Sequence, residues 1–260
     1  MQKTCELELD AKAYVSDSEI QLTLADKMLE TYSFNQSARV LDVGSGDGRI
    51  TSNIAQKVPK GKIIGVDASL NMVEYAKTHY SQKGFPNLEF IYEKAENLCL
   101  EGDFDNIVSF NCFHWIRPWK KTLRLFNNLL KTKGEILMLT YPKDSPFLIP
   151  LHEAAKSYPE YVDKAAGSTM FTSKELKEAL IDLGLTLERF EEYRDTISYD
   201  SYGVLKDFVR IWLTSYIPLP NEFKEEFLDR FIENIKPYRI DRGDGKIHLP
   251  YVALLVHARK

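Results

Sequence analysis

The stretch Val40–Arg49 reads Val-Leu-Asp-Val-Gly-Ser-Gly-Asp-Gly-Arg and decides the fold of this 260-residue chain. Its apolar run predicts a buried strand over Arg39–Val43, and a helical pattern starts at Ile50, after three closely spaced glycines. Glycine tolerates positive φ and lets a ligand approach the main chain closely. A strand that leads through a glycine turn into a helix N-terminus is the general nucleotide-binding device of α/β sheets. The stretch therefore predicts an α/β fold with a nucleotide site behind its first strand.

The rest of the chain continues the alternation of strands and helices. Strands that alternate with helices at this interval predict right-handed βαβ units and a parallel sheet. We therefore expect a doubly wound, mostly parallel, seven-stranded sheet. The expected strands are Arg39–Val43, Ile63–Val66, Leu88–Tyr92, Phe104–Phe110, Glu135–Thr140, Leu187–Ser198 and Ile247–Ala258. The helix that begins near Pro118 is expected to run to Leu130, with Lys133-Gly134 as its stop signal.

The regular alternation of strands and helices is interrupted after Tyr141, although one domain is expected overall. Residues 1–141 hold an N-terminal helix and the nucleotide-binding half of the sheet. The segment 142–170 carries three prolines and a short helical patch, and 171–199 returns to the sheet. Two helices in 200–245 then interrupt the sheet before the last strand in 246–260. We expect the segments 142–170 and 200–245 to form a helical lid over the carboxyl ends of the strands.

Composition excludes several classes of protein. The formal net charge is −4, which gives no indication of a surface that binds nucleic acid. The three cysteines are widely spaced, so neither a disulfide framework nor a C-x-x-C metal site is expected. The N-terminal residues form no apolar signal core, and no apolar run reaches membrane-spanning length. We therefore expect a cytoplasmic protein without a metal or a membrane partner, and we leave the oligomeric state open.

The identity of the nucleotide follows from two residues. Arg49 stands where the dinucleotide fingerprint G-x-G-x-x-G places its third glycine. Asp42 lies at the end of the first strand, where its charge would repel a pyrophosphate. Both residues argue against an NAD-dependent dehydrogenase and favour a ligand that presents an ammonium group. The stretch resembles the first motif of the class I methyltransferases that use S-adenosylmethionine (SAM).

The resemblance implies a complete cofactor site. Asp67 ends the second expected strand, where an acid accepts hydrogen bonds from both ribose hydroxyls, although it also fits a helix N-cap. Met72 fits an adenine face or the helix core, and Lys94 stands where most family members have an acid. The cofactor residues that the resemblance implies are Tyr14, Asp42, Gly44, Ser45, Gly46, Asp67, Ala68, Met72, Ala95, Glu96 and Asn111.

The run Asn111–Ile116, Asn-Cys-Phe-His-Trp-Ile, is the second informative stretch. It follows the fourth expected strand, where the crevice of such a sheet opens. With the segments around Trp212 and Tyr251, it resembles the small-molecule carboxyl methyltransferases, the trans-aconitate and juvenile hormone acid enzymes. The resemblance implies that Gln21, His114 and Trp115 lie at the acceptor, with Gln21 and Trp115 holding its carboxylate.

The resulting interpretation is methyl transfer from SAM to a carboxylate oxygen of a small acid, with S-adenosylhomocysteine as the other product. A carboxylate is already ionised near neutral pH, so this reaction needs no strong general base. Ile217 precedes Pro218 where the trans-aconitate branch has an arginine, which favours a hydrophobic acid. Alternatives are a malonyl group on acyl-carrier protein, a phenol, an amine, and a SAM-binding module without catalysis. A phenol would need a base, and His114 is the local candidate.

Overall fold

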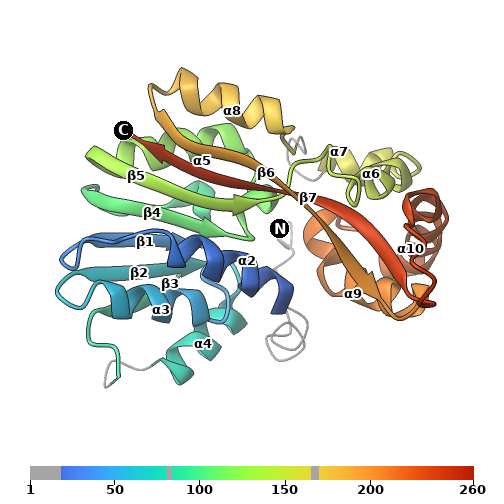
Figure 1. Cartoon of the computed structure of the whole chain (residues 1–260), viewed down its shortest axis with the longest axis horizontal. Helices are drawn as coiled ribbons and strands as arrows, with labels where there is room; N and C mark the ends of the chain where they lie inside the picture. Colours follow the sequence, from blue (N-terminus) through green and yellow to red (C-terminus); the bar gives the residue numbers. More distant parts are fainter. Residues whose placement is uncertain (1–18, 81–83, 165–169) are drawn as a thin grey trace, which may run out of the picture.

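The computed structural model describes residues 19–80, 84–164 and 170–260. Seven strands lie in one sheet: β1 (Arg39–Val43), β2 (Lys62–Asp67), β3 (Leu88–Tyr92), β4 (Phe104–Phe110), β5 (Leu130–Thr140), β6 (Thr186–Tyr199) and β7 (Ile247–Arg259). Their order across the sheet is β3-β2-β1-β4-β5-β7-β6. β7 runs antiparallel to both β5 and β6, and every other neighbouring pair is parallel. The prediction of a mostly parallel, seven-stranded sheet is confirmed (Figure 1).

The bounds of β1, β3 and β4 are those expected from the apolar runs. The largest difference is in β5, which begins at Leu130 rather than at Glu135. The preceding helix ends at Leu129, one residue before the expected Leu130, but Lys133-Gly134 lies inside β5, so the prediction that this pair ends the helix was wrong. The backbone turns inside β5 instead, where Lys133 has a positive φ of 66° and the pairing with β4 shifts register. A local glycine signal was therefore read as a helix end although it marks an irregularity within a strand.

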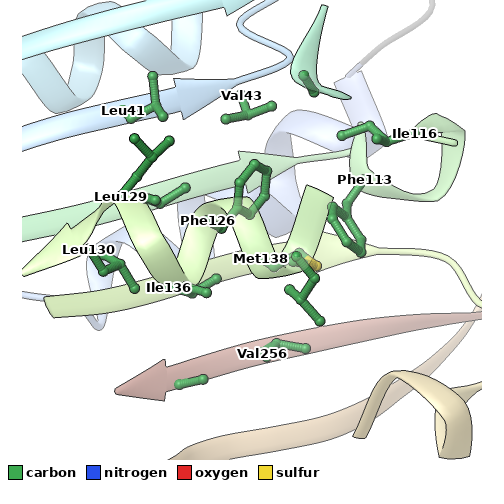
Figure 2. Close-up of a cluster of buried hydrophobic side chains, with 14 of the residues drawn as sticks. Leu41, Val43, Phe113, Ile116, Phe126, Leu129, Leu130, Ile136, Met138 and Val256 are labelled. Carbon is green, nitrogen blue, oxygen red and sulfur yellow. The ribbon is translucent and has the colours of Figure 1, made fainter. Parts of the chain in front are cut away.

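Helices cover both faces of the sheet because side chains alternate between its faces along each strand. Val40 points to one face and packs with the first group of helices, while Leu41 packs with the second group. The first group is α2 (Glu19–Glu30), α3 (Arg49–Lys57) and α4 (Leu70–His79). The second group is α5 (Trp119–Leu129) and α8 (Ser173–Asp182). Figure 2 shows the core on the α5 side, where Phe126 and Met138 pack against strand residues.

The remaining helices form a separate layer, which we call the helical lobe: α6 (Ile149–Ala155), α7 (Pro159–Lys164), α9 (Tyr202–Tyr216) and α10 (Asn221–Ile235). The arrowheads of β4 and β5 point towards this lobe in Figure 1. Its two chain segments pack on each other, since the ring centroids of Phe147 and Phe231 are 6.1 Å apart and Asn234 Nδ2 donates to the Pro150 carbonyl at 3.3 Å. Short 3₁₀ turns complete the fold at η1 (Ala95–Asn97), η2 (Phe113–Trp115) and η3 (Lys236–Tyr238).

Candidate active site

The glycine turn after β1 lies against the loop that follows β4. Gly44 has a φ of +82°, and a Cβ on this residue would lie 2.2 Å from Cys112 Sγ. The Gly44 and Ser45 amides donate to the Val66 carbonyl at 2.8 and 3.0 Å. The turn is therefore held between β2 and the loop after β4, and glycine is required at its first position.

Asp67 links the turn to the end of β2. Its Oδ2 accepts from the Gly46 amide at 2.8 Å, and its Oδ1 accepts from the Ser69 amide at 2.8 Å. Ser69, and not Asp67, is the N-cap of α4, because its side chain accepts from the Met72 amide. Burial raises the pKa of Asp67, and the backbone donors around it, including Ala68, oppose this shift. The carboxylate thus lies at the carboxyl edge of the sheet, beside the glycine turn.

Asp42 places a second carboxyl group close to the first. It is 2% exposed, and its Oδ2 accepts a hydrogen bond from Thr51 Oγ1 at 2.7 Å. Burial, together with the negative charge of Asp67, raises the pKa of Asp42 to about 7. Neither carboxyl group forms an ion pair with a lysine or arginine in the described part of the chain. A cationic ligand would remove the repulsion between the two groups.

Ser45 provides a direct test of whether the turn fits a ligand. Its hydroxyl is buried, and it has no hydrogen-bond partner among the described residues. A buried hydroxyl without a partner is costly, so a ligand that supplies one fits this position. The main chain of the glycine turn, two carboxyl groups and this hydroxyl together suit a ligand with amine and ribose groups.

Of the other expected cofactor residues, one lies in the hydrophobic core and two lie close to the site. Met72 is fully buried within α4, which suits its role as a core residue at least as well as an adenine contact. Ala95 is buried at the start of η1, after β3. Glu96 is half-buried, and its charge helps to raise the pKa of Cys112, so it lies near the loop after β4. The structure therefore brings the η1 segment to the same edge as Asp42 and Asp67.

Asn111 begins the loop after β4 in a left-handed conformation. Its φ is 57°, and its amide donates to the Leu139 carbonyl at 2.8 Å. Its side-chain Oδ1 accepts from the Tyr141 hydroxyl at 2.9 Å. These contacts tie the loop to the end of β5 and direct η2 towards the helical lobe.

His114 is buried behind this loop and is uncharged near neutral pH. It is 5% exposed, and its Nδ1 lies 3.3 Å from Thr140 Oγ1. Burial lowers the pKa of His114 to about 3, and the positive charge of Arg117 contributes to the shift. The ring also packs edge-on to Tyr141, with centroids 5.0 Å apart. A histidine with this pKa is too weak a base to activate a phenol efficiently.

Trp115 connects the sheet to the helical lobe. It is half-buried, and its ring centroid lies 4.5 Å from that of His114 and 5.3 Å from that of Trp212 on α9. Trp115 also packs against the apolar core of the lobe. The residue thus stands at the junction between the cofactor edge and the lobe.

The sequence pattern did not identify Arg117 and His152 as site residues. Arg117 follows η2 directly and donates through Nη1 to the Tyr216 carbonyl at 3.3 Å. His152 lies on α6, with its Nδ1 2.6 Å from the Tyr216 hydroxyl. A charged residue between the apolar Ile116 and a proline was the one local signal that could have drawn attention to Arg117.

Two expected residues are not placed. Tyr14 lies outside the described residues. Gln21 lies in α2, but its side chain is also outside the described part of the structure. Both roles therefore stay predictions.

Among residues 19–80, 84–164 and 170–260, no group of three or more His, Cys, Asp or Glu side chains is arranged to hold a metal ion. Within the same residues, no helix has the length and apolar character needed to cross a membrane.

Known proteins resemble the chain in sequence. Residues 34–184 match the family model described as a methyltransferase domain. The juvenile hormone acid O-methyltransferase of Drosophila melanogaster is 25% identical, over 96% of this chain and 92% of its own length. A malonyl-[acyl-carrier protein] O-methyltransferase of Ilyobacter polytropus is 32% identical, over 94% of this chain and 90% of its own length.

Solved structures share the fold. The YcgJ protein of Bacillus subtilis matches with a TM-score of 0.67 at 22% identity, over 92% of this chain and 98% of its own. Coclaurine N-methyltransferase, bound to N-methylheliamine and S-adenosylhomocysteine, matches with a TM-score of 0.58 at 14% identity, over 93% of this chain and 73% of its own. The family match covers more than half of the chain and includes the glycine turn, β2 and the loop after β4. The chain therefore belongs to the methyltransferase domain family and is a methyltransferase.

Proposed function

We propose that this methyltransferase uses SAM to methylate a carboxylate oxygen of a small, hydrophobic acid. The observation that carries the proposal is the neutral His114 beside Trp115. Its pKa of about 3 leaves the junction without a histidine base, which suits an acceptor that is already ionised. Catalysis then depends mainly on alignment of the acceptor and on exclusion of water.

The glycine turn supports SAM as the cofactor. Asp67 would accept the ribose hydroxyls, and Asp42 would face the ammonium group, while the buried Ser45 hydroxyl would gain a partner. When bound, SAM supplies an electrophilic methyl group whose departure leaves a neutral thioether. The coclaurine enzyme, which shares the fold, holds S-adenosylhomocysteine and gives independent support.

The helical lobe supports an acceptor with an apolar body. Trp115 packs with Trp212, and the buried Ile217 follows on the same segment. Trp115 and Trp212 are half-buried and offer aromatic surface, which gains free energy when an apolar substrate covers it, while Ile217 belongs to the apolar core behind them. The Drosophila relative acts on an acid, and its match extends over the lobe as well as the sheet.

A malonyl group on acyl-carrier protein is the second candidate acceptor. The Ilyobacter relative supports it, because that protein is matched over nearly its whole length. This acceptor is also a carboxylate, so the chemistry at His114 and Trp115 would be the same. A phenol and an amine are the alternative acceptors; the family match argues against a SAM-binding module without transfer. A cytoplasmic location and the absence of nucleic-acid and membrane partners stay predictions from composition.

The decisive experiment follows a labelled methyl group from SAM by mass spectrometry. The acceptors are panels of small acids, phenols and amines, together with malonyl-acyl-carrier protein. Label should enter apolar acids as methyl esters at a rate that stays flat between weakly acidic and weakly basic pH. Label in phenols or amines alone would contradict the proposal. So would a rate that follows one ionisation and loses that dependence in His114→Ala.

Two variants test the roles of the expected acceptor residues. Trp115→Ala and Gln21→Ala should each lower the transfer rate roughly tenfold or more, the scale of one lost positioning contact. Affinity for S-adenosylhomocysteine should change little. Gln56→Ala, at an exposed position on α3, is the matched control for Gln21 and should transfer at the original rate. His114→Ala should be affected less than Trp115→Ala.

A further inference from the structure

Arg117 carries a positive charge that no acidic side chain neutralises in the described part of the structure. Its Nε is buried and has no hydrogen-bond partner among the described residues. Among residues 19–80, 84–164 and 170–260, the guanidinium forms one hydrogen bond, from Nη1 to the Tyr216 carbonyl at 3.3 Å, and no ion pair with an acid. Burial lowers the pKa of Arg117, but a guanidinium stays protonated in proteins. Arg117 as a whole is half-buried, and a partly buried cation without a counter-ion is unfavourable, so this position suits an anion.

His152 supplies a second buried donor next to the same tyrosine. Its Nδ1 lies 2.6 Å from the Tyr216 hydroxyl, while its Nε2 is buried without a partner in the described part of the chain. Burial raises the pKa of Tyr216, so its hydroxyl keeps its proton and can donate to Nδ1. Burial and the charge of Arg117 lower the pKa of His152 to about 4, so the ring is neutral near neutral pH. In the tautomer in which Nδ1 accepts from the Tyr216 hydroxyl, the ring proton is on Nε2 and can be donated to a ligand.

Both donors lie at the junction already described. Arg117 stands two residues beyond Trp115, and its charge acts on the rings of both His114 and His152. Tyr216 lies one helical turn beyond Trp212, whose ring packs against Trp115. One tyrosine therefore holds an arginine from the sheet side and a histidine from the lobe side.

We propose that Arg117 and His152, both held by Tyr216, form the receptor for the carboxylate of the acceptor. The inference rests on the proposed carboxyl methylation and adds the cationic group that Gln21 and Trp115 do not supply. The matching ligand is a small acid with one carboxylate and an apolar body, because Trp115 and Trp212, whose rings pack together, precede Arg117 and Tyr216 closely in the chain. Two carboxylate oxygens offer about four acceptor sites, so both donors can be satisfied while a lone pair stays available for the methyl group.

The receptor has a consequence for specificity. Methylation converts the anionic acid into a neutral ester, which can no longer form charge-assisted hydrogen bonds with Arg117. The enzyme should therefore bind an acid more tightly than the corresponding methyl ester, and product release should be favoured. A site that recognises only the apolar body would bind the two about equally.

The first test measures binding by calorimetry to protein saturated with S-adenosylhomocysteine. The probes are benzoate, hexanoate and decanoate, each with its methyl ester. Wild-type protein should bind at least one acid roughly tenfold or more tightly than its ester, the scale of a charged hydrogen bond. Arg117→Gln should weaken that acid roughly 10- to 100-fold and leave the ester unchanged. Arg124→Gln, which removes an exposed arginine from α5, is the control and should bind both as before.

Two more variants separate binding from folding. Arg117→Lys keeps the charge but loses Nε, so it should recover part of the acid affinity. His152→Phe removes the second donor and should weaken the acid roughly tenfold without affecting the ester. Affinity for S-adenosylhomocysteine and the circular dichroism spectrum report whether each variant is folded. In transfer assays Arg117→Gln should raise KM for the acid more than it lowers kcat.

An NMR measurement tests the receptor without turnover. The Arg117 Nε–H signal, identified by its absence in Arg117→Lys, should shift when the acid is added and stay in place with the ester. No shift with any of the three acids would overturn the receptor. If acids are methylated but Arg117→Gln keeps the acid-to-ester preference, the receptor is wrong and the proposed function stands. If acids shift the signal but only amines or phenols are methylated, the receptor stands and the proposed function is wrong.

Discussion

Substitution of Gly44 by alanine tests how closely the glycine turn is packed against the loop after β4. Two independent costs can be read at this position. The φ of +82° is unfavourable for any residue with a Cβ, and the new Cβ would lie 2.2 Å from Cys112 Sγ and 2.3 Å from Cys112 Cβ. Both of these atoms would have to move before alanine fits.

The magnitude follows from adding the two costs. The left-handed conformation costs about 1–2 kcal/mol, and forced displacement in a packed region costs about 1–3 kcal/mol. Gly44→Ala should therefore lower the free energy of unfolding by about 2–5 kcal/mol, a large share of the ~5–15 kcal/mol of a typical domain. Gly46→Ala is the matched control, because its φ is +52° and a Cβ there meets no atom within 4 Å. It should carry the backbone cost alone, about 1–2 kcal/mol.

Urea unfolding of the single variants and one double variant separates the two costs. Cys112→Gly removes both overlapping atoms, and the next atom of that residue, Cα, lies 3.7 Å from the Cβ position. The double variant Gly44→Ala with Cys112→Gly should regain about 1–3 kcal/mol relative to the sum of the single changes. The reasoning is refuted if Gly44→Ala is no more destabilising than Gly46→Ala. It is also refuted if the double-variant cycle gives no coupling between residues 44 and 112.

Three further predictions concern the cofactor edge and the lobe. Asp67→Ala should weaken S-adenosylhomocysteine binding by roughly 1.5–3 kcal/mol, the range for hydrogen bonds to charged groups. Calorimetry that finds the original protein binding NAD more tightly than S-adenosylhomocysteine would contradict the cofactor assignment. The native state keeps the Asp42 proton until about pH 7 while the unfolded chain releases it near 3.8, so stability should fall as pH rises between these values. Urea unfolding of Asp42→Asn should lack this fall, and an identical pH dependence in both proteins would count against the shifted pKa. Hydrogen exchange in 142–170 and 200–245 should slow when S-adenosylhomocysteine binds, and protection confined to the glycine turn would leave the proposed lid without support.

The cofactor site at the carboxyl ends of β1 and β2 was predictable from sequence because the residues that form it lie close together in the chain or directly after strands. Strand, glycine turn and helix lie within a few residues of one another around Gly44, so the pattern of apolar and glycine residues fixes them together. Asp67 was predictable for a similar reason, since parallel strands bring their carboxyl ends to one edge. The start of β5 was not, because the irregularity at Lys133 depends on pairing with β4 and has no local signature beyond a glycine.

At the junction between the sheet and the helical lobe, only part of the set of residues could be predicted from the sequence. Trp115 could be selected because it lies in a short run after a recognised strand. Arg117, His152 and Tyr216 come from three separate parts of the chain and meet only when α6, α9 and η2 pack together. No periodicity or spacing in the sequence encodes such a meeting, which requires the tertiary packing of the lobe on the sheet.

The long pair of strands β6 and β7 has a consequence for folding kinetics. The pairing runs from Thr186 with Arg259, at the sheet, to Tyr199 with Ile247, in the core of the lobe. β7 must also pair with β5, and its Arg259 lies nearly half the chain away in sequence from its partner Glu135. Because contacts between distant residues form slowly, the lobe and the edge of the sheet should acquire their structure in one late step. The lobe should therefore not appear first as an independent unit during refolding.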